Sequence, residues 1–367
     1  MRIVVLGGLG NFGARICRAL AADPGLTVIA AGRSASPSAI RANFGELPVT
    51  AAALDVQAAA FAADLKALAP HIVIHCAGPF QGQGYGVALA ACAAGAHYID
   101  LADGRDFVCG FPPAVDAAAR AAGVLAVSGA SSVPGLSSAV VDALQSRFRQ
   151  LEVIHTVIAP GQKAPRGDAT FAAVLSYAGR PVRRLRCGHW GQSHGWQDMR
   201  RVRVAGLKPR WAAVCDVPDL ELFPERYPGV QTVEFRAALE LGLQHYALWL
   251  LAGLRRLGLP LPLERMAGGL NRFSKWLDAL GGDRGGMLVG LQGTMSHGKP
   301  GMLAWHLSAP GNHGPEIPCM AAILLARKLA TGDLSQRGAH PCLGLLTIED
   351  FAPEFERWGM RARIEEA

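Results

Sequence analysis

Residues 2–13 read RIVVLGGLGNFG and decide the fold of the N-terminal part of the chain. A short apolar run is followed by glycines with the spacing G-x-G-x-x-G. This motif indicates a dinucleotide site where it joins a strand to a helix. Such glycines permit a tight turn, close approach of a pyrophosphate and packing of helix on strand. We therefore predict a strand, a helix over residues 14–22, and a dinucleotide at the helix N-terminus. The residues expected to hold its pyrophosphate are Gly8, Gly10, Asn11, Phe12 and Gly13.

After this motif, the sequence predicts that strands and helices alternate up to residue 127. Apolar runs bounded by glycine or turn residues predict five more strands, at 27–31, ending at Leu54, at 71–75, at 97–101 and at 124–127. Helices are expected between them at 57–68, 85–94 and 114–122. Parallel strands need a crossover of about a dozen residues, which these helices supply. The sequence thus predicts an α/β fold with a Rossmann-type doubly wound parallel sheet.

The pattern changes after residue 133 and predicts a second, α+β domain. Its expected elements are a strand at 152–159, a hairpin of 287–293 with 302–307, and helices at 171–177, 237–257 and 318–330. We accordingly divide the chain into a Rossmann domain at 1–133, a second domain at 134–314 and a C-terminal segment at 315–367.

The end of the second strand indicates which cofactor is bound. An NAD site usually has a carboxylate there, accepting a hydrogen bond from the ribose 2′-hydroxyl. This chain has Arg33 and Ser34 instead, which suit a 2′-phosphate, so NADP(H) is favoured over NAD(H). An ordinary solvent-facing Arg33 is the alternative. Asp55, after the third strand, either binds the adenine amine or caps the next helix.

Candidates for the reacting end of the cofactor follow the fourth and fifth strands. Small residues after the fourth strand lie where the strand order reverses, and there we expect the nicotinamide. These residues are Ala77, Gly78, Pro79 and Phe80. Hydride chemistry also needs a group that handles a proton, and Tyr98, Asp103 and Arg105 at the end of the fifth strand are the catalytic candidates. Asp103 can equally be a loop cap or a salt-bridge partner of Arg105.

These stretches resemble the saccharopine dehydrogenase-like family. The resemblance rests on residues 78–80, 85–86 and 91–100, and on the loop 128–135. It implies an NADP-binding Rossmann domain, a second domain for substrate binding and dimerisation, and a C-terminal segment that packs back on the first domain. It also implies pyridine-nucleotide chemistry at a carbon–nitrogen bond, in a family that includes paralogues with lipid-related substrates. A homodimer acting on a small molecule is the corresponding expectation.

Composition excludes several other classes. Half of the 367 residues are apolar and 18% are charged, which is typical of a globular protein. The formal net charge of +7 comes without a nucleic-acid reading element, so no nucleic-acid partner is expected. Eight cysteines without a C-x-x-C pair, and Met1 leading straight into a strand, favour a reducing cytoplasm and no metal site. The apolar stretch 247–263 is interrupted by arginines and prolines. It predicts a buried or interface helix or a peripheral lipid contact, and no membrane span.

The function expected from these residues is an NADP(H)-dependent oxidoreductase acting on an imine or carbonyl. Two alternatives remain open at this point. One is a nucleotide-binding protein without turnover, with a role in assembly or at a lipid surface. The other is an enoyl reductase for a lipid-type substrate, which would share the cofactor and differ in the apolarity of its pocket.

Overall fold

The computed structural model describes residues 1–366, which form two compact units. The first unit contains Met1–Leu136 and Glu316–Leu346, and the second contains Ser137–Pro315 and the chain from Thr347 onward. We expected one C-terminal segment from residue 315, whereas the two units divide that segment after Leu346.

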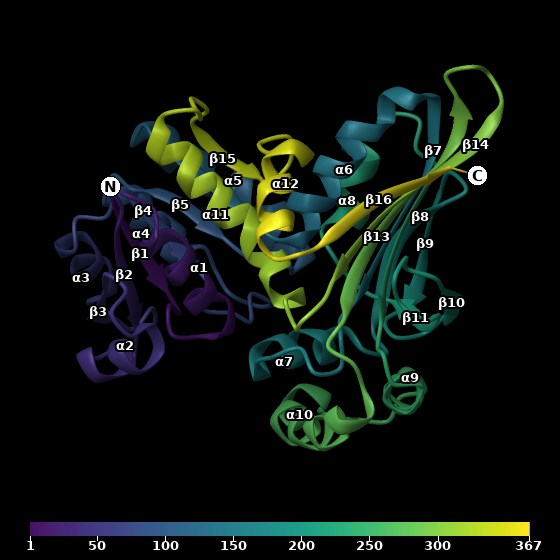
Figure 1. The fold of residues 1–367 in the computed structure, drawn as a ribbon, viewed down its shortest axis with the longest axis horizontal. Coiled ribbons are helices and arrows are strands. Elements are labelled where there is room, and N and C mark those ends of the chain that lie inside the picture. The colour runs from purple at the N-terminus through teal and green to yellow at the C-terminus, as the bar shows by residue number, and fades with distance from the viewer. Residues whose placement is uncertain (367) are drawn as a thin grey trace. The chain divides into compact units, whose positions relative to one another are not determined.

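The first unit is built on a parallel sheet of seven strands in the order β15-β6-β5-β4-β1-β2-β3 (Figure 1). The bounds are β1 Arg2–Leu6, β2 Thr27–Gly32, β3 Val49–Ala53, β4 Ile72–His75, β5 His97–Asp100, β6 Leu125–Ser128 and β15 Gly338–Pro341. The order reverses at β1, which pairs with β2 on one side and β4 on the other. This is the Rossmann arrangement, so the predicted fold class is confirmed. The seventh strand, β15, pairs with β6 and was not predicted.

Helices cover this sheet because its strands are apolar on both faces. Ile3, Val4 and Val5 of β1 are all fully buried, as expected of a parallel strand between two helical layers. The helices are α1 Asn11–Ala21, α2 Pro37–Phe44, α3 Phe61–Ala67, α4 Gly86–Ala93, α5 Arg105–Ala121 and α11 Ile317–Thr331. α11 packs beside α1 (Figure 1), and an Arg327–Asp23 ion pair of 2.7 Å joins α11 to the end of α1.

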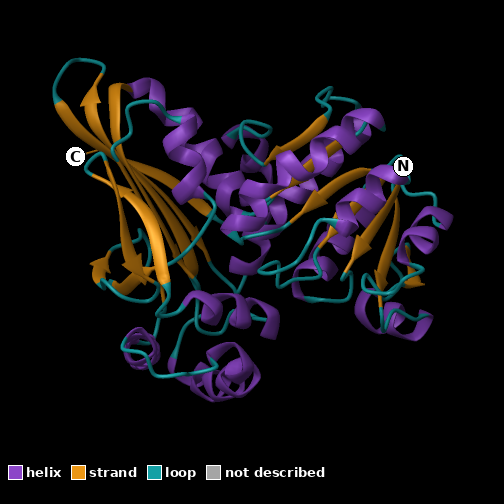
Figure 2. Cartoon of the chain, turned by 180° about the vertical axis from the view of Figure 1, so that it is seen from behind, coloured by secondary structure: helices purple, strands orange, loops and turns teal. Residues whose placement is uncertain are grey.

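The second unit has a mixed sheet in the order β10-β11-β12-β7-β13-β14-β16 (Figure 2). Three of its strands, β7, β13 and β14, have 12, 11 and 10 residues and are longer than any strand of the first sheet. The bounds are β7 Phe148–Ala159, β10 Arg200–Val202, β11 Arg210–Val214, β12 Thr232–Ala238, β13 Gly285–Met295, β14 Pro300–Ala309 and β16 Arg361–Glu366. A separate hairpin is formed by β8 Pro181–Arg186 and β9 His189–His194. The predicted hairpin is confirmed, because β13 and β14 pair antiparallel.

The helices of the second unit are α6 Ser137–Leu144, α7 Asp168–Tyr177, α8 Asp219–Arg226, α9 Gly242–Arg256, α10 Ala267–Trp276 and α12 Ile348–Arg357. Short helical turns are η1 Ser132–Leu136 in the first unit at its boundary, and η2 Gln145–Arg147, η3 Leu263–Met266 and η4 Leu277–Leu280 in the second. The predicted helix 237–257 was wrong at its start, since residues 232–238 form β12. Over residues 1–366, no helix has the length and apolarity needed to cross a membrane.

Candidate functional site

The turn between β1 and α1 is shaped by four glycines. Gly7, which precedes the G-x-G-x-x-G motif, has a φ of +76° and makes the left-handed turn. A β-carbon on Gly8 would lie 2.7 Å from the Cα atom of Ala30 in β2, and one on Gly13 would overlap the carbonyl oxygen of Gly7. Gly8 and Gly13 are therefore required by packing within the protein.

Gly10 differs from these glycines because little of the protein crowds it. It is exposed, it is the N-cap of α1, and a β-carbon there would approach only the carbonyl oxygen of Gly7, at 3.1 Å. The first amides of a helix have no partner within the helix and carry partial positive charge. Asn11 and Phe12, both half-buried, begin α1, whose first turn has no acidic residue. This turn can accept a phosphate group at the backbone.

Arg33 and Ser34 lie directly after β2 and are exposed. A β-carbon on Gly32, the last residue of β2, would meet no atom within 4 Å, so space is open at this strand end. Among the residues that the structure describes, no carboxylate forms an ion pair with Arg33. The guanidinium is thus available to an anion.

Asp55 follows β3 and is exposed. Its carboxylate accepts a 3.1 Å hydrogen bond from the amide of Gln57, which closes a local turn. The next helix, α3, begins at Phe61 and has Ala60 as its N-cap. The alternative that Asp55 caps this helix was therefore wrong.

The loop after β4 packs on the glycine turn. A β-carbon on Gly7 would lie 3.1 Å from the amide nitrogen of Ala77, so the two backbones are in contact. The side chain of Gln83 donates hydrogen bonds to the carbonyls of Ala77 and Pro79, at 3.0 and 2.6 Å, and shapes the loop. Sequence reasoning missed Gln83, although it is a polar residue in a glycine-rich stretch. Ala77, Gly78 and Pro79 are accessible at this edge of the sheet.

Phe80, the next residue of this loop, is not accessible at the edge of the sheet. It is buried, and its ring packs against His75 and Phe107 with centroids 5.0 and 5.3 Å apart. The expectation that Phe80 lines a nicotinamide site therefore conflicts with its burial in an aromatic cluster.

Tyr98 is likewise in the core, with 1% of its surface exposed. Its hydroxyl lies 3.0 Å from Nδ1 of His75, and its ring stacks on Phe111. Burial raises the pKa of Tyr98 well above its usual value, and burial lowers the pKa of His75 to about 4. We had placed Tyr98 at the edge of the sheet, whereas it is in the middle of β5 and points into a packed layer.

Asp100 ends β5 and holds the loop after β6. Its Oδ1 atom accepts hydrogen bonds from the amide of Ala102 (2.9 Å), the hydroxyl of Ser128 (3.0 Å) and the amide of Gly129 (2.8 Å). Burial raises the pKa of Asp100 to about 6, and these hydrogen bonds oppose the rise. The role of Asp100 is to fix the backbone at the carboxyl ends of β5 and β6.

Asp103 and Arg105 follow at the same end of β5. Asp103 is half-buried and its carboxylate accepts a 3.1 Å hydrogen bond from the side-chain amide of Gln81. Burial raises the pKa of Asp103, and the Gln81 bond acts against this. Arg105 is the first residue of α5, which begins nine residues before the predicted start at 114. Gln81 thus brings Asp103 to the loop that contains Ala77.

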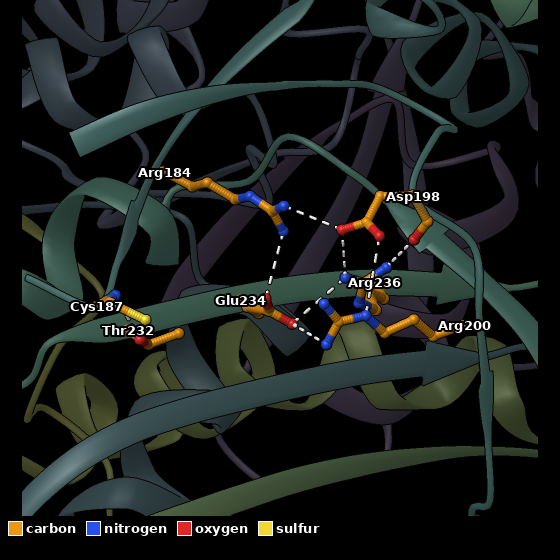
Figure 3. A network of polar contacts seen from close by, with 7 residues as sticks. All are labelled: Arg184, Cys187, Asp198, Arg200, Thr232, Glu234 and Arg236. Atoms are coloured by element: carbon orange, nitrogen blue, oxygen red, sulfur yellow. Dashed lines mark hydrogen bonds and ion pairs between the residues drawn. The ribbon is translucent and has the colours of Figure 1, made fainter. Parts of the chain in front are cut away.

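The second unit contains a network of arginines and carboxylates around β12 (Figure 3). Arg184, Arg200 and Arg236 pair with Asp198 and Glu234 at N–O distances between 2.9 and 3.8 Å. Burial raises the pKa of each carboxyl, but the arginines outweigh it and hold both values below their usual range. These arginines are therefore engaged in joining β8 and β10 to β12.

Two pockets are lined by no residue of the glycine turn. One, of about 690 Å³, is lined by residues of α2 and β3 such as Arg41 and Ala51. The other, of about 310 Å³, adjoins the arginine network and is lined by residues such as His155 and Arg186. In residues 1–366, no group of three or more His, Cys, Asp or Glu side chains is arranged to hold a metal. The nucleotide-site candidate rests on backbone geometry at the sheet edge.

A parallel sheet in this strand order, with a glycine turn from β1 into α1, defines a dinucleotide-binding Rossmann domain. Residues 3–127 match the family model described as the saccharopine dehydrogenase NADP binding domain. No curated protein matches the sequence.

Two solved structures share the fold over the whole chain. Apo saccharopine dehydrogenase (L-Glu forming) from Saccharomyces cerevisiae has 11% identity and a TM-score of 0.69, with 100% of this chain and 99% of that chain covered. Homospermidine synthase from Legionella pneumophila, in complex with NAD, has 10% identity and a TM-score of 0.60, with 100% and 91% covered. At these identities the similarity is one of fold.

Proposed function

We propose that the protein is an NADP(H)-dependent oxidoreductase that transfers hydride to or from an imine or carbonyl carbon. The observation that carries the proposal is the exposed Gly10 at the N-terminus of α1, in a glycine turn whose Gly7 contacts the loop of Ala77. Residues 3–127 also match the saccharopine dehydrogenase NADP binding domain. The yeast dehydrogenase shares the fold of the full chain, which supports an enzyme of related class.

The residues fit a dinucleotide phosphate in two places. Gly10, whose own amide donates to the Gly7 carbonyl, lets a pyrophosphate approach the start of α1, where Asn11 and Phe12 offer backbone amides. Arg33 and Ser34 offer a guanidinium and a hydroxyl to a 2′-phosphate, at a strand end with open space. When bound, the cofactor supplies or accepts the hydride. The unpaired state of Arg33 supports NADP(H) over NAD(H).

For proton transfer we propose Asp103. Its raised pKa keeps part of the carboxyl protonated closer to neutral pH, which suits a general acid for an imine nitrogen or carbonyl oxygen. Arg105 would add positive charge close by. Tyr98 is buried, so we assign it a positioning role in which its hydroxyl and His75 stabilise β4 and β5.

The test is NADPH oxidation, followed by nicotinamide absorbance, with a panel of 2-keto acids offered with and without ammonia or primary amines. Steady turnover with a panel member is the expected result. NADPH binding without turnover on the panel, or on enoyl thioesters added to it, contradicts the catalytic proposal and favours a nucleotide-binding protein. Turnover on enoyl thioesters alone would favour the lipid-type reductase.

A further inference from the structure

Exposed large apolar side chains are concentrated in one segment of the second unit. Of the 16 such residues within the part of the chain that the structure describes, ten lie between Leu243 and Leu280. They are Leu243, Tyr246, Trp249, Leu250, Leu257, Leu259, Met266, Phe273, Trp276 and Leu280. Single exposed apolar residues are normal, whereas a concentration of this kind marks an interaction site. We call residues 242–280 the α9–α10 surface.

The outer face of α9 is a leucine stripe. Leu243, Leu250 and Leu257 are spaced by seven residues, so they share one side of the helix, and 68, 55 and 80% of their surfaces are exposed. The opposite side packs inward through His245 and Leu248. A helix at the surface of a globular protein normally has a polar outer face. α9 instead presents leucine to the solvent.

The helix α10 repeats this arrangement with aromatic residues. Phe273, Trp276 and the following Leu280 are 55, 82 and 71% exposed, while Asn271 and Ser274 face inward. The side chain of Gln244 in α9 donates to the hydroxyl of Ser274 at 3.0 Å, so the two helices are neighbours. Both helices lie at one end of the strands of the second unit (Figure 1).

The free charge on this surface is positive. The segment contains five basic residues, Arg255, Arg256, Arg265, Arg272 and Lys275, and two acidic ones, Glu264 and Asp278. Glu264 is paired with Arg180 and Arg255 at 3.0 and 2.9 Å, and Asp278 is paired with Arg166 at 2.7 Å. Arg256, Arg265, Arg272 and Lys275 are exposed.

The positive charge of this surface favours an anionic membrane over a second copy of the chain as its binding partner. A second copy bound through a two-fold contact would place the same cations against each other, which is unfavourable. An anionic membrane offers acyl chains to the leucine and aromatic side chains and phosphates to the cations. Tryptophan at the boundary between lipid and water is also favourable, because its ring is apolar with one polar edge.

We propose that the α9–α10 surface binds the surface of anionic lipid membranes, with the leucine stripe and Trp276 in the acyl boundary and the cations at the headgroups. The contact is peripheral. It does not depend on the oxidoreductase proposal, and it is compatible with a homodimer formed through another surface.

The test is flotation with vesicles of phosphatidylcholine, alone or mixed with phosphatidylglycerol. The wild-type protein is expected to float with the mixed vesicles and to be released by high salt. Leu250→Ser with Trp276→Ser should weaken binding at least about tenfold, because each substitution removes an apolar side chain that the proposal places in the acyl boundary. Arg272→Gln with Lys275→Gln should weaken it roughly twentyfold at low salt. The matched control Leu89→Ser, at an exposed leucine of α4, should bind as the wild type does.

Three results would overturn the proposal. They are wild-type protein that stays at the bottom of the gradient, equal binding to both kinds of vesicle, and a Leu250→Ser/Trp276→Ser variant that floats like the wild type. Light scattering adds a fourth: a wild-type dimer that becomes monomeric in this variant shows that a second copy covers the surface. If circular dichroism shows that the Leu250→Ser/Trp276→Ser variant is misfolded, two measurements still test the proposal. They are the binding of the wild-type protein to the two kinds of vesicle and the binding of the Arg272→Gln/Lys275→Gln variant.

Discussion

The side-chain amide of Gln81 donates a 3.1 Å hydrogen bond to the carboxylate of Asp103. This bond joins the loop after β4, which contains Ala77, to the residue after β5 that we propose as the proton donor. It also opposes the rise that burial causes in the pKa of Asp103. Gln81 therefore holds the Asp103 carboxylate and partly offsets the effect of burial on its pKa.

Two substitutions separate these effects. Asp103→Asn keeps a hydrogen-bonding side chain and removes the proton, so kcat should fall by about 10²–10⁴-fold with little change in NADPH affinity. Gln81→Leu removes a bond that stabilises the carboxylate, so the pKa of Asp103 should rise and the loss of activity at alkaline pH should move to higher pH. Steady-state kinetics over pH on the best panel substrate measures both. An Asp103→Asn enzyme with unchanged kcat would assign proton transfer to another group.

Gly10 and Gly13 form a matched pair. Alanine at Gly13 would overlap the carbonyl oxygen of Gly7, so Gly13→Ala should lower the free energy of unfolding by about 1–3 kcal/mol or more. Alanine at Gly10 would meet the same oxygen at 3.1 Å, a smaller conflict than at Gly13, so Gly10→Ala should lower stability by less than about 1 kcal/mol and weaken NADPH binding about tenfold or more. Urea unfolding and calorimetric titration provide the two readouts. Equal NADPH affinity in Gly10→Ala and the wild type would move the pyrophosphate elsewhere.

Arg33 should set the preference for the 2′-phosphate. Arg33→Asp replaces a charge-assisted hydrogen bond with repulsion, so NADPH affinity should fall roughly a hundredfold while NADH affinity is kept or improved. Lys66→Asp, a charge reversal at an exposed residue of α3, is the control and should leave both affinities unchanged. A ratio of NADPH to NADH affinity that is the same in Arg33→Asp and the wild type would remove Arg33 from the site.

Asp219 predicts a pH dependence of stability. It is buried in the second unit, accepts a 2.7 Å hydrogen bond from the Ser137 hydroxyl, and burial raises its pKa to about 7. Between its unfolded pKa, about 4, and its folded pKa, the native state binds more protons than the unfolded state. The contribution of Asp219 to stability is therefore full below pH 4 and is lost as the pH rises to about 7.

The variant Asp219→Asn isolates this group. Its free energy of unfolding, relative to the wild type, should increase between pH 4 and 7 by on the order of a few kcal/mol. Chemical unfolding of both proteins at a series of pH values measures the difference. A difference that is constant over this range would show that the Asp219 carboxyl titrates normally in the folded protein.

The first unit could be predicted because its strands are short, apolar and bounded by glycine, and because the glycine spacing fixes a strand–turn–helix. β15 could not, since it contains His340 and Pro341 and pairs with a strand more than 200 residues earlier. The start of α5 was predicted too late, at residue 114, because Pro112 and Pro113 lie inside the helix. Proline lacks an amide donor and normally marks a helix end, but here tertiary packing outweighs that preference.

The second unit was harder to predict. The six residues of β16 are all exposed and those of β9 are exposed or half-buried, so neither strand has the alternation of apolar and polar residues that marks a strand. In the candidate site, the glycines, Arg33 and Asp103 were identified as candidates because each follows the end of a predicted strand. The burial of Tyr98 and Phe80 could not, because it depends on an aromatic cluster assembled from β4, β5 and α5. Gln81 and Gln83 act through loop geometry that the sequence does not reveal.

We propose that the first unit binds NADP(H) at the glycine turn, with Arg33 on the 2′-phosphate. Calorimetric titration of the wild-type protein with NADPH and, separately, with NADH measures this binding. We predict one NADPH site per chain and NADH affinity at least about tenfold weaker. NADH bound as tightly as NADPH would contradict the assignment of Arg33, and the absence of binding by either nucleotide would contradict the nucleotide site itself.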